Sequence, residues 1–354
     1  MQKKQTGGFA RMLRRQPKPL WLVIVCHILA LGIALLVYAT FHHVIVREEV
    51  AEGLKSSRSG AVEAMAQETP VPEVQAEIVS EATVEPEITP EPAPTDAPGS
   101  FRIKFADKFT TGAVEATDTT YRSANVNLTV STTRYMESDC HVADIYVADI
   151  GYLVTAMAED KYGRGFREWP AEFAQRYNAL ITLSGDYYGG RSDGVVIRNG
   201  TLYRDQFVSS DVCVLNWDGT METLEAYEFD VDRAMENGAY QAWNFGPLLL
   251  DKQGQPMTEF NSDVLKANPR AAIGYYEPGH YCLVMVDGRS SRSEGLTMTD
   301  LSNFMYSLGC KAAYNLDGGQ TAAMVKANEI YGAPYKGGRD VSDVIMILDY
   351  MIGQ

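Results

Sequence analysis

The sequence lacks the short motifs that mark several common kinds of active and metal-binding site. It contains neither a GxxxxGK[ST] phosphate loop nor a GxGxxG turn, so nothing in it supports nucleotide-driven chemistry. Histidine and cysteine are scarce, with five of each in 354 residues. Because no CxxC or histidine-rich spacing occurs among them, the sequence indicates no structural zinc site.

Positive charge is also scarce over most of the chain. The sequence holds 31 Lys and Arg against 46 Asp and Glu, a net charge of -15. The first 47 residues carry seven bases and no acid, so the remainder is more acidic than the total suggests. Nucleic-acid affinity depends on cationic side chains that neutralise phosphates. The acidic body therefore argues against DNA or RNA as a partner.

Long hydrophobic runs are absent except for one near the N-terminus. Residues 20–41 have no formally charged side chain, and as a helix they would be about 33 Å long, enough to cross a bilayer. Six bases precede this run, so the positive-inside rule places residues 1–19 in the cytoplasm. We predict a single-pass protein of the cell membrane with an extracellular C-terminal domain. Cleavage of the run as a signal peptide is the alternative.

The next segment, residues 48–100, has a composition typical of disorder. It holds twelve acids, two bases and seven prolines, and such a segment cannot bury enough apolar surface to fold. We predict an extended acidic linker between the membrane helix and one folded domain, residues 101–354.

Within residues 101–354, short apolar runs alternate with helical patterns. Runs bounded by Gly, Asp or Asn predict strands at residues 141–150, 179–184, 195–203, 212–216, 271–276, 281–286 and 344–349. Helices are predicted at residues 170–180 and 301–308, the second with Thr299 as N-cap and Gly309 just beyond its end. These elements predict an α+β or mixed α/β fold, in which a mixed β-sheet is flanked by helices.

The folded domain contains four cysteines, which are Cys140, Cys213, Cys282 and Cys310. An even number would permit two disulfides. Cys213 and Cys282 lie in strand-like apolar runs, however, where a free cysteine packs as a small hydrophobic side chain. The spacing therefore favours free cysteines.

Three strand ends carry an aspartate beside a glycine. They are Ser184-Gly185-Asp186, Asp287-Gly288 and Asp317-Gly318-Gly319. Glycine lets another group approach closely, so these ends, with Arg270 and Arg289, predict one shared cleft. Arginine suits bidentate contact with carboxylate or phosphate, and the N–H groups of Gly318 and Gly319 could form a nest for an anion.

Six motifs of this domain resemble, in the same order, those of the phosphodiester glycosidase family. They are SGDYYGGRSDGVVIRNGTLYRD (184–205), NFGPLLL (244–250), NPRAAIG (268–274), VDGRSSRSEGLTMTDLSNFMYSLG (286–309), AYNLDGGQTAAM (313–324) and GGRDVSDVIMI (337–347). A single motif of this kind would be weak evidence for the family, but six motifs in the same order are a specific signal. The resemblance implies an extracytoplasmic hydrolase that cleaves a sugar-1-phosphodiester, such as a GlcNAc-phosphodiester, in cell-envelope or exopolysaccharide glycans.

The resemblance and the chemistry of that bond imply roles for the site residues. A phosphate leaves as a stable anion and needs little protonation. Arg270 and Arg289 would hold this phosphate, while Asp317, or else Asp287, faces the anomeric carbon as nucleophile or base. Substrate-binding residues are expected at Ser184, Gly185, Asp186, Tyr188, Gly246, Asn315, Gly318, Gly319 and Arg339.

Several structural alternatives stay open for these residues. Asp186 could orient an arginine, and Tyr188 could pack in the core. Asp287 could form an ion pair with an arginine. Arg339 could pair with Asp343. We expect no cofactor and no metal site, because the three aspartates lack the spacing of a cation-binding loop, although a divalent cation stays an open possibility.

The chain departs from the family pattern at three places. Ser184 stands where the family usually has Asn, Ala271 where it has Thr, and residues 320–323 read Gln-Thr-Ala-Ala where it has Gly-Ser-Ser-Thr. The replaced groups would orient a sugar or phosphate. Two other functions are therefore weighed: a phosphodiesterase that cleaves the P–O bond, and a non-catalytic glycan-binding module.

Overall fold

The computed structural model describes residues 29, 31–32, 51–52, 96–207 and 209–352. The chain divides into two compact units, Met1–Arg47 and Glu48–Gln354, and the fold described below belongs to the second. The predicted membrane helix at residues 20–41 and the predicted linker at residues 48–100 lie mostly outside the described residues. No helix in the described part of the chain is long and apolar enough to cross a membrane.

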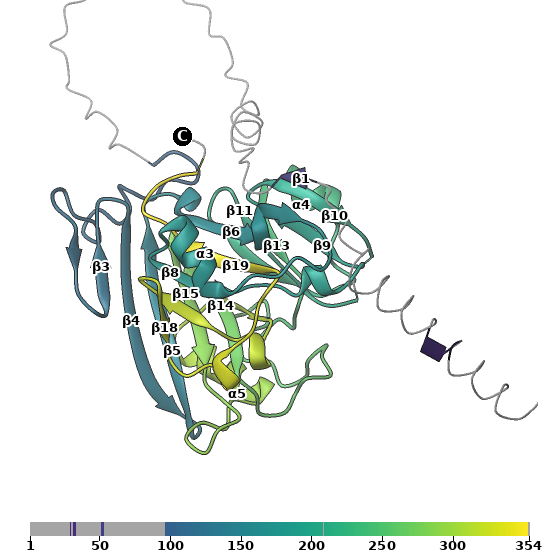
Figure 1. The fold of residues 1–354 in the computed structure, drawn as a ribbon. Coiled ribbons are helices and arrows are strands. Elements are labelled where there is room, and N and C mark those ends of the chain that lie inside the picture. The colour runs from purple at the N-terminus through teal and green to yellow at the C-terminus, as the bar shows by residue number, and fades with distance from the viewer. Residues whose placement is uncertain (1–28, 30, 33–50, 53–95, 208, 353–354) are drawn as a thin grey trace, which may run out of the picture. The chain divides into compact units, whose positions relative to one another are not determined.

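A seven-stranded sheet forms the largest layer (Figure 1). Its strands are β2 (Glu115–Ala116), β3 (Thr120–Arg122), β4 (Val126–Tyr135), β5 (Ser138–Val147), β14 (Arg270–Glu277), β15 (His280–Val286) and β16 (Ala312–Leu316). They lie in the order β16-β14-β15-β5-β4-β3-β2. Met136 and Glu137, both with positive φ, join β4 to β5, as a two-residue hairpin turn requires.

Two five-stranded sheets and one short strand pair complete the β structure. The first contains β9 (Val195–Arg198), β10 (Thr201–Asp205), β11 (Val212–Asn216), β12 (Met221–Leu224) and β13 (Ala239–Trp243), in the order β10-β9-β13-β11-β12. The second contains β6 (Leu153–Met157), β8 (Ile181–Ser184), β17 (Met324–Lys326), β18 (Glu329–Tyr331) and β19 (Asp343–Ile347), in the order β18-β17-β8-β19-β6. The short pair joins β1 (Ala51–Glu52) to β7 (Lys161–Tyr162).

The prediction of a mixed sheet is wrong, because every described strand pair is antiparallel. Hairpins and loops make the connections, whereas parallel pairing needs a long crossover, usually a helix. The protein is mostly β, and its helices are few.

The inner faces of the three large sheets share one hydrophobic core. Val130 of β4 and Leu283 of β15 meet Leu183 of β8, Leu215 of β11 and Ile345 of β19 in it. Neighbouring side chains along these strands point the other way, as the two-residue period of a strand dictates. Each sheet therefore has an outer face that needs its own cover.

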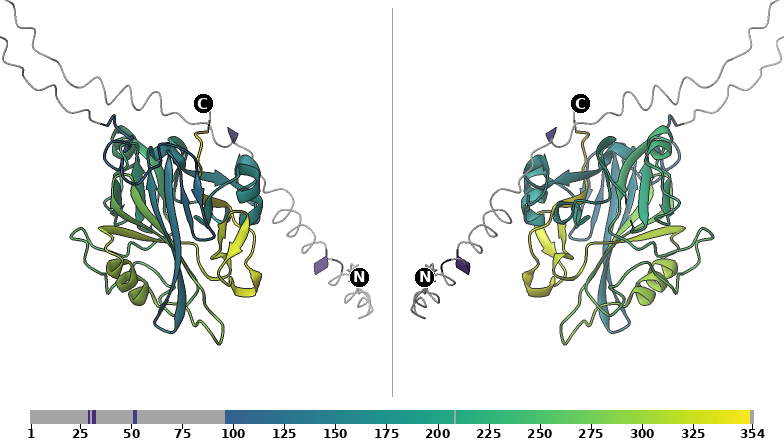
Figure 2. Two further views of the ribbon diagram at one scale, coloured as in Figure 1. Left: turned by 90° about the vertical axis from the view of Figure 1, so that its left-hand side faces the viewer. Right: turned by 90° about the vertical axis from the view of Figure 1, so that its right-hand side faces the viewer.

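The expected flanking helices supply that cover. They are α3 (Pro170–Tyr177), α4 (Val231–Glu236) and α5 (Met298–Ser307). Phe173 of α3 packs with Val344 of β19, Ala234 of α4 with Val214 of β11, and Phe304 of α5 with Val284 of β15. Figure 2 shows α3 and α5 on opposite sides of the sheets.

The predicted helix limits were close but not correct. In α5 the N-cap is Thr297, whose hydroxyl accepts a hydrogen bond from the N–H of Asp300, so Thr299 lies inside the helix. Gly309 follows α5 with φ 86°, as predicted. Asn178 adopts a left-handed conformation and ends α3 before residue 180. Single 3₁₀ turns occur at η1 (Ile150–Tyr152), η2 (Ala158–Asp160), η3 (Tyr188–Gly190), η4 (Gly319–Thr321) and η5 (Tyr335–Gly337).

Candidate active site

Three predicted site residues lie at the same end of three neighbouring strands. Arg270, the first residue of β14, pairs with Val286, the last residue of β15. The next residue of β14 pairs with the last residue of β16. Asp287 and Asp317 directly follow β15 and β16. The antiparallel register therefore brings Arg270 between the two aspartate-glycine ends.

Pro269 is the residue against which these ends pack. A Cβ atom on Gly288 would lie 2.6 Å from the Pro269 nitrogen, and one on Gly318 would lie 2.8 Å from the Pro269 carbonyl oxygen. Both positions therefore need glycine for close backbone approach. Gly319 donates its N–H to the Pro269 carbonyl at 2.8 Å. This bond uses one of the two N–H groups of the predicted anion nest, so that prediction is wrong for Gly319.

The third aspartate-glycine end joins the other two through the backbone. Asp317 donates its N–H to the carbonyl of Gly185 at 3.0 Å. A Cβ atom on Gly185 would lie 2.7 Å from Oδ1 of Asp343, which explains the glycine. Ser184 is fully buried, and its hydroxyl accepts a hydrogen bond from the N–H of Ala323. Ser184 therefore supports the loop after β16 and has no surface for a substrate.

Asp317 is the carboxyl group whose properties best suit chemistry. The side chain of Asp317 is 11% exposed, and Nη2 of Arg339 lies 4.0 Å from its Oδ2. Burial raises its pKa to about 6, although a hydrogen bond from Thr321 and the charges of Arg339 and Arg167 oppose the rise. A carboxyl group with a pKa near neutrality can take up or release a proton at physiological pH.

Arg289 is exposed and lies beside the loop that carries Asp317. A Cβ atom on Gly319 would be 3.4 Å from its Nη2. Its Nε and Nη2 donate to Oδ1 of Asn268 at 3.1 and 2.7 Å, and its guanidinium lies 5.2 Å from the ring centre of Tyr335. Among the described residues it has no carboxylate partner in an ion pair, so its charge is available to an anion.

Arg270 is buried beneath this surface. Its Nε donates to the carbonyl of Leu296 at 2.9 Å, and its Nη2 donates to the carbonyls of Val264 and Lys266 at 3.0 and 2.7 Å. Burial, together with the charge of Arg289, lowers its pKa to about 10. Arg270 thus fixes two loops at the site and adds positive charge from below, whereas Arg289 is the arginine with an exposed head.

Asp287 faces a histidine. Its Oδ2 lies 3.2 Å from Nε2 of His141, and its Oδ1 accepts the N–H of Ala333 at 2.9 Å. Nδ1 of His141 lies 2.8 Å from the hydroxyl of Thr132. The alternative of an ion pair with an arginine is therefore wrong, because the side chain that lies against the Asp287 carboxylate is His141. Through Ala333, Asp287 holds the start of the loop that carries Tyr335 and leads to Arg339.

A fully buried arginine joins two other carboxylates. Arg198 donates from Nε to Oδ2 of Asp343 at 2.9 Å, and its Nη2 lies 2.8 Å from the same oxygen and 3.4 Å from Oδ2 of Asp186. Burial raises the pKa of Asp343, and Arg198 opposes this shift. Asp186 has no exposed side-chain surface, which fits its alternative role of orienting an arginine.

The expected pairing of Arg339 with Asp343 is wrong. Asp343 begins β19 and faces Arg198, while Arg339 reaches Asp317. The i, i+4 pairing would have needed helix between the two residues, but the chain is not helical there. Arg339 therefore stays a candidate for substrate contact, now through its position beside Asp317.

Three further residues that were predicted to bind substrate have structural roles instead. Tyr188 is buried, stacks on Tyr162 at 5.7 Å and lies against the Arg198 guanidinium, so it packs in the core and cannot stack on a sugar. Asn315 is buried and donates from Nδ2 to the carbonyl of Gly246 at 2.7 Å. Gly246, with φ 79°, precedes a cis peptide bond. Both hold residues 246–250 along β16.

Sequence reasoning missed several residues that shape the site. Arg198 gave a faint signal, since a charged residue at the end of the apolar run VVIR is unusual. Arg167 gave none, because its partners lie far away in sequence. Nη1 of Arg167 hydrogen-bonds Ser342, and its guanidinium lies 5.3 Å from the ring centre of Tyr187. Only the fold brings the charge of Arg167 toward Asp317.

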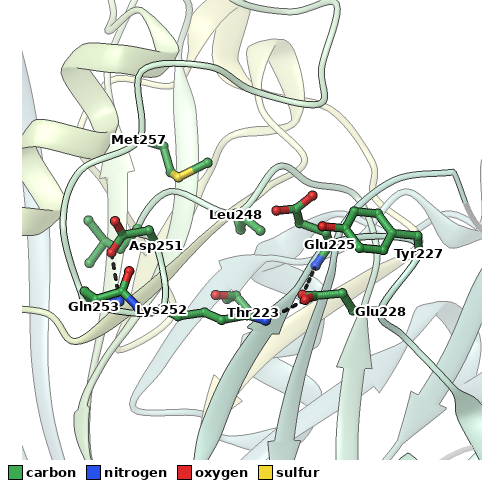
Figure 3. A pocket seen from close by; sticks show the side chains of 10 residues that line it. Thr223, Glu225, Tyr227, Glu228, Leu248, Asp251, Lys252, Gln253 and Met257 are labelled. Atoms are coloured by element: carbon green, nitrogen blue, oxygen red, sulfur yellow. Dashed lines mark hydrogen bonds and ion pairs between the residues drawn. The ribbon is translucent and has the colours of Figure 1, made fainter.

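A pocket of about 290 Å³ lies apart from these residues (Figure 3). Glu225 and Glu228 line one side of it, and Asp251 and Lys252 line the other. Lys252 pairs with Glu228 at 2.5 Å, which leaves two acids unbalanced and disfavours a phosphate. In the part of the chain that the structure describes, no group of three or more His, Cys, Asp or Glu residues could hold a metal ion.

Comparison with known proteins identifies the family. A family model described as phosphodiester glycosidase matches residues 177–348, a segment that contains all three aspartate-glycine ends. Residues 177–348, just under half of the chain, thus match the model of the phosphodiester glycosidase family. The description of this family model agrees with the resemblance of the six motifs.

One curated protein matches part of this chain in sequence. The SPbeta prophage-derived uncharacterized protein YomE of Bacillus subtilis (strain 168) is 34% identical over 169 residues, 45% of this chain and 26% of that protein. The chain thus spans about a quarter of the length of this curated relative.

Two solved structures share the fold. The catalytic domain of zebrafish N-acetylglucosamine-1-phosphodiester alpha-N-acetylglucosaminidase, auto-inhibited by its pro-peptide, has a TM-score of 0.51 at 20% identity, covering 69% of this chain and 86% of that one. A hypothetical protein from Synechocystis has a TM-score of 0.52 at 12% identity, covering 67% and 64%. At these identities the likeness concerns the fold alone.

Proposed function

We propose that the protein hydrolyses a sugar-1-phosphodiester by breaking the bond between the anomeric carbon and the phosphate oxygen. The observation that carries this proposal is the setting of Asp317. Its carboxyl group, with a pKa raised to about 6, lies beside Arg339, and the exposed head of Arg289 lies against Gly319 in the same loop. The match of residues 177–348 to the phosphodiester glycosidase model supports this reaction.

The arginines supply the electrostatic part of the mechanism. Negative charge grows on the phosphate oxygen as the glycosidic bond breaks. Arg289 offers an exposed guanidinium to that charge, and Arg270 adds a fixed charge behind it. Donors held in place before the reaction stabilise such charge strongly. Because phosphate is already a good leaving group, the mechanism needs no strong general acid.

Asp317 supplies the nucleophilic part. As a carboxylate it attacks the anomeric carbon or removes a proton from an attacking water. Both roles require the deprotonated group. The rate should therefore rise as the pH increases through about 6, the pKa of Asp317. A rate that falls across this interval would assign Asp317 the role of a general acid.

The departures from the family pattern support retained activity. Ser184 and Ala323, two of the substituted positions, contact each other, because the Ser184 hydroxyl accepts the Ala323 N–H. Ala271, Ala322 and Ala323 are all fully buried. The substitutions at Ser184, Ala271, Ala322 and Ala323 therefore change packing behind the site. Gln320 is half-buried and Thr321 hydrogen-bonds Asp317, so the departures at these two positions remain the sequence support for the glycan-binding alternative.

A direct assay tests the proposed activity. The protein is incubated with a GlcNAc-1-phosphodiester, and free GlcNAc is measured. We expect release, and we expect Asp317→Asn to reduce kcat by on the order of 10³. Asp205→Asn, a change of an exposed aspartate on β10, is the matched control and should leave kcat unchanged. Release that survives Asp317→Asn would remove Asp317 from the mechanism, and binding without release would favour a glycan-binding module.

We also propose that residues 20–41 anchor the protein in the membrane with the glycosidase domain outside the cell. The charge asymmetry around this apolar run supports that arrangement. Protease added to intact cells should then remove the domain and leave a membrane-bound N-terminal fragment. Domain found free in the medium would instead indicate cleavage of the run, and protection of the domain would contradict the orientation.

A further inference from the structure

Two cysteines that are distant in sequence meet in the core between α5 and the seven-stranded sheet. Cys282 lies in the middle of β15, and Cys310 follows the end of α5. Their Sγ atoms are 3.7 Å apart. Both side chains belong to the hydrophobic cluster under α5, where Cys282 is fully buried and Cys310 is 4% exposed. The sequence spacing gave no hint of this neighbourhood.

Gly274 makes room for the two sulfur atoms. It lies opposite Cys282 in the β14–β15 pair, and a Cβ atom on it would be 2.6 Å from Sγ of Cys282 and 2.6 Å from Sγ of Cys310. Glycine inside a strand is unfavourable, since it adds no packing and loses more backbone entropy than other residues. Its presence here is explained by the space that the two sulfurs occupy.

We propose that Cys282 and Cys310 form a disulfide bond when the protein meets a disulfide donor, such as oxidised glutathione or a thiol oxidoreductase. The other two described cysteines serve as internal references. Cys140 and Cys213 are as deeply buried, but no cysteine pair other than Cys282 and Cys310 is in sulfur contact within the described residues. The inference does not depend on the proposed glycosidase activity.

The bond would form by two exchange steps. The thiolate of Cys310, the more accessible residue, attacks a sulfur of the donor disulfide and releases one donor thiolate. Cys282 then loses its proton and attacks Sγ of Cys310, which releases the second donor thiol. In total, two protein thiols are oxidised and one donor disulfide is reduced to two thiols. The hydrogen bond with Cys310 and burial raise the pKa of Cys282, so Cys282 is the less reactive thiol and takes the second step.

The disulfide would lock α5 onto the sheet at the edge of the site. The segment that it closes, residues 282–310, contains all of α5 and Arg289. Cross-linking a folded domain restricts its unfolded state more than its native state. We therefore expect oxidation to raise the Tm by about 5–10 °C relative to the reduced protein, without a change of fold.

Peptide mapping tests the pairing. The full chain is refolded in a glutathione redox buffer, so that buried thiols can react before the core closes, and a second sample is oxidised in the native state. Free thiols are then alkylated, and the protein is digested with trypsin without reduction. We expect residues 271–289 and 293–311, each with one cysteine, to appear as one cross-linked pair, while the peptides of Cys140 and Cys213 appear alkylated.

Two variants separate this pairing from unspecific oxidation. Cys310→Ser should abolish the cross-link, leave Cys282 alkylated and remove the effect of oxidant on the Tm. Cys140→Ser should leave both the cross-link and the Tm shift intact. Refolded wild-type protein whose Cys282 and Cys310 peptides are both alkylated, or are linked to Cys140 or Cys213, would overturn the proposal.

Discussion

Burial of the Asp317 carboxyl group has opposite effects on catalysis and on stability. Burial raises its pKa to about 6 from an ordinary 3.8, which suits it to chemistry near neutral pH. The same burial makes its charged form costly to fold. A residue of this kind is expected to reduce stability in return for activity.

The pH dependence of stability follows from this shift. Between pH 4 and pH 6 the folded state holds a proton on Asp317 that the unfolded state has lost, so the free energy of unfolding falls as the pH rises through that interval. The shift from 3.8 to about 6 corresponds to a loss on the order of 3 kcal/mol by pH 7. Asp317→Asn should therefore be more stable than wild type at pH 7, by up to this amount.

Urea unfolding at pH 7 and pH 4 measures this difference. The extra stability of Asp317→Asn should largely disappear at pH 4, where Asp317 of the folded wild-type protein is also neutral. Asp205→Asn should have the wild-type free energy of unfolding at both pH values. A variant that is less stable than wild type at pH 7 would show that the carboxylate is stabilised by its neighbours, contrary to the pKa shift.

Arg289 carries the clearest prediction about the leaving phosphate. Arg289→Ala should lower kcat/KM for a sugar-1-phosphodiester by on the order of 10², because one preorganised donor to the developing charge is lost. Arg289→Lys should recover only part of this loss, since lysine lacks the planar fork. Initial rates over a range of substrate concentrations measure both effects.

Arg292 provides the matched control in the same loop. It is 82% exposed and pairs with Asp139, away from Asp317. Arg292→Ala should leave kcat/KM near the wild-type value. If Arg292→Ala and Arg289→Ala reduced kcat/KM equally, general loss of positive charge would explain the result and the specific phosphate contact would be wrong.

At the residue scale, sequence reasoning identified the right types of side chain but not their partners. It grouped Asp317, Arg270 and Arg289, and the antiparallel register does bring their backbone positions together. It could not tell that Arg270 bonds three carbonyls or that Arg198 is wholly buried. Partners of this kind come from distant strands, and one sequence contains no information on which strands are neighbours.

At the element scale, the strand ends depend on glycines that allow backbones to touch. Gly318→Ala would place a Cβ atom 2.8 Å from the Pro269 carbonyl, so the loop carrying Asp317 must shift. We expect a destabilisation of about 1–3 kcal/mol and a loss of activity larger than the loss of folded protein. Gly112→Ala is the control, since nothing lies within 4 Å of its added Cβ.

Denaturant unfolding and kcat measured on the same samples test this claim. The Gly112→Ala variant should be unchanged in activity and stability. If Gly318→Ala had wild-type stability and kcat, the close packing on Pro269 would not be needed to position Asp317.

Strands and helices were predictable to different degrees. Apolar runs bounded by turn residues located β5, β8, β11, β14, β15 and β19, and the i, i+3, i+4 pattern located α5. The longest missed strand, β4, shows the alternation Val126, Leu128 and Val130, which is a strand signal that the search for continuous apolar runs passed over. The start of α3 at Pro170 was predicted correctly, whereas the N-cap of α5 was off by two residues because Thr297 and Thr299 are equally plausible caps in sequence.

At the scale of the whole molecule, three antiparallel sheets around one core hold the strand ends in place. The sequence predicted a mixed sheet because strand patterns alternate with helical patterns and with connections long enough for a crossover. In the structure, the helices instead pack on the outer faces of antiparallel sheets. Which strands pair depends on distant contacts that no local pattern encodes. The membrane anchor at residues 20–41 stays a prediction, since it lies outside the described residues apart from residues 29, 31 and 32.

Hydrolysis in water labelled with ¹⁸O tests the central claim, that the bond between the anomeric carbon and the phosphate oxygen is broken. The phosphomonoester product is the decisive species, because the anomeric oxygen of a free sugar exchanges with water. Mass spectrometry of the products from a GlcNAc-1-phosphodiester should find the phosphomonoester unlabelled and the label in freshly released GlcNAc. Label in the phosphomonoester would show P–O cleavage and contradict the assignment of this protein as a glycosidase.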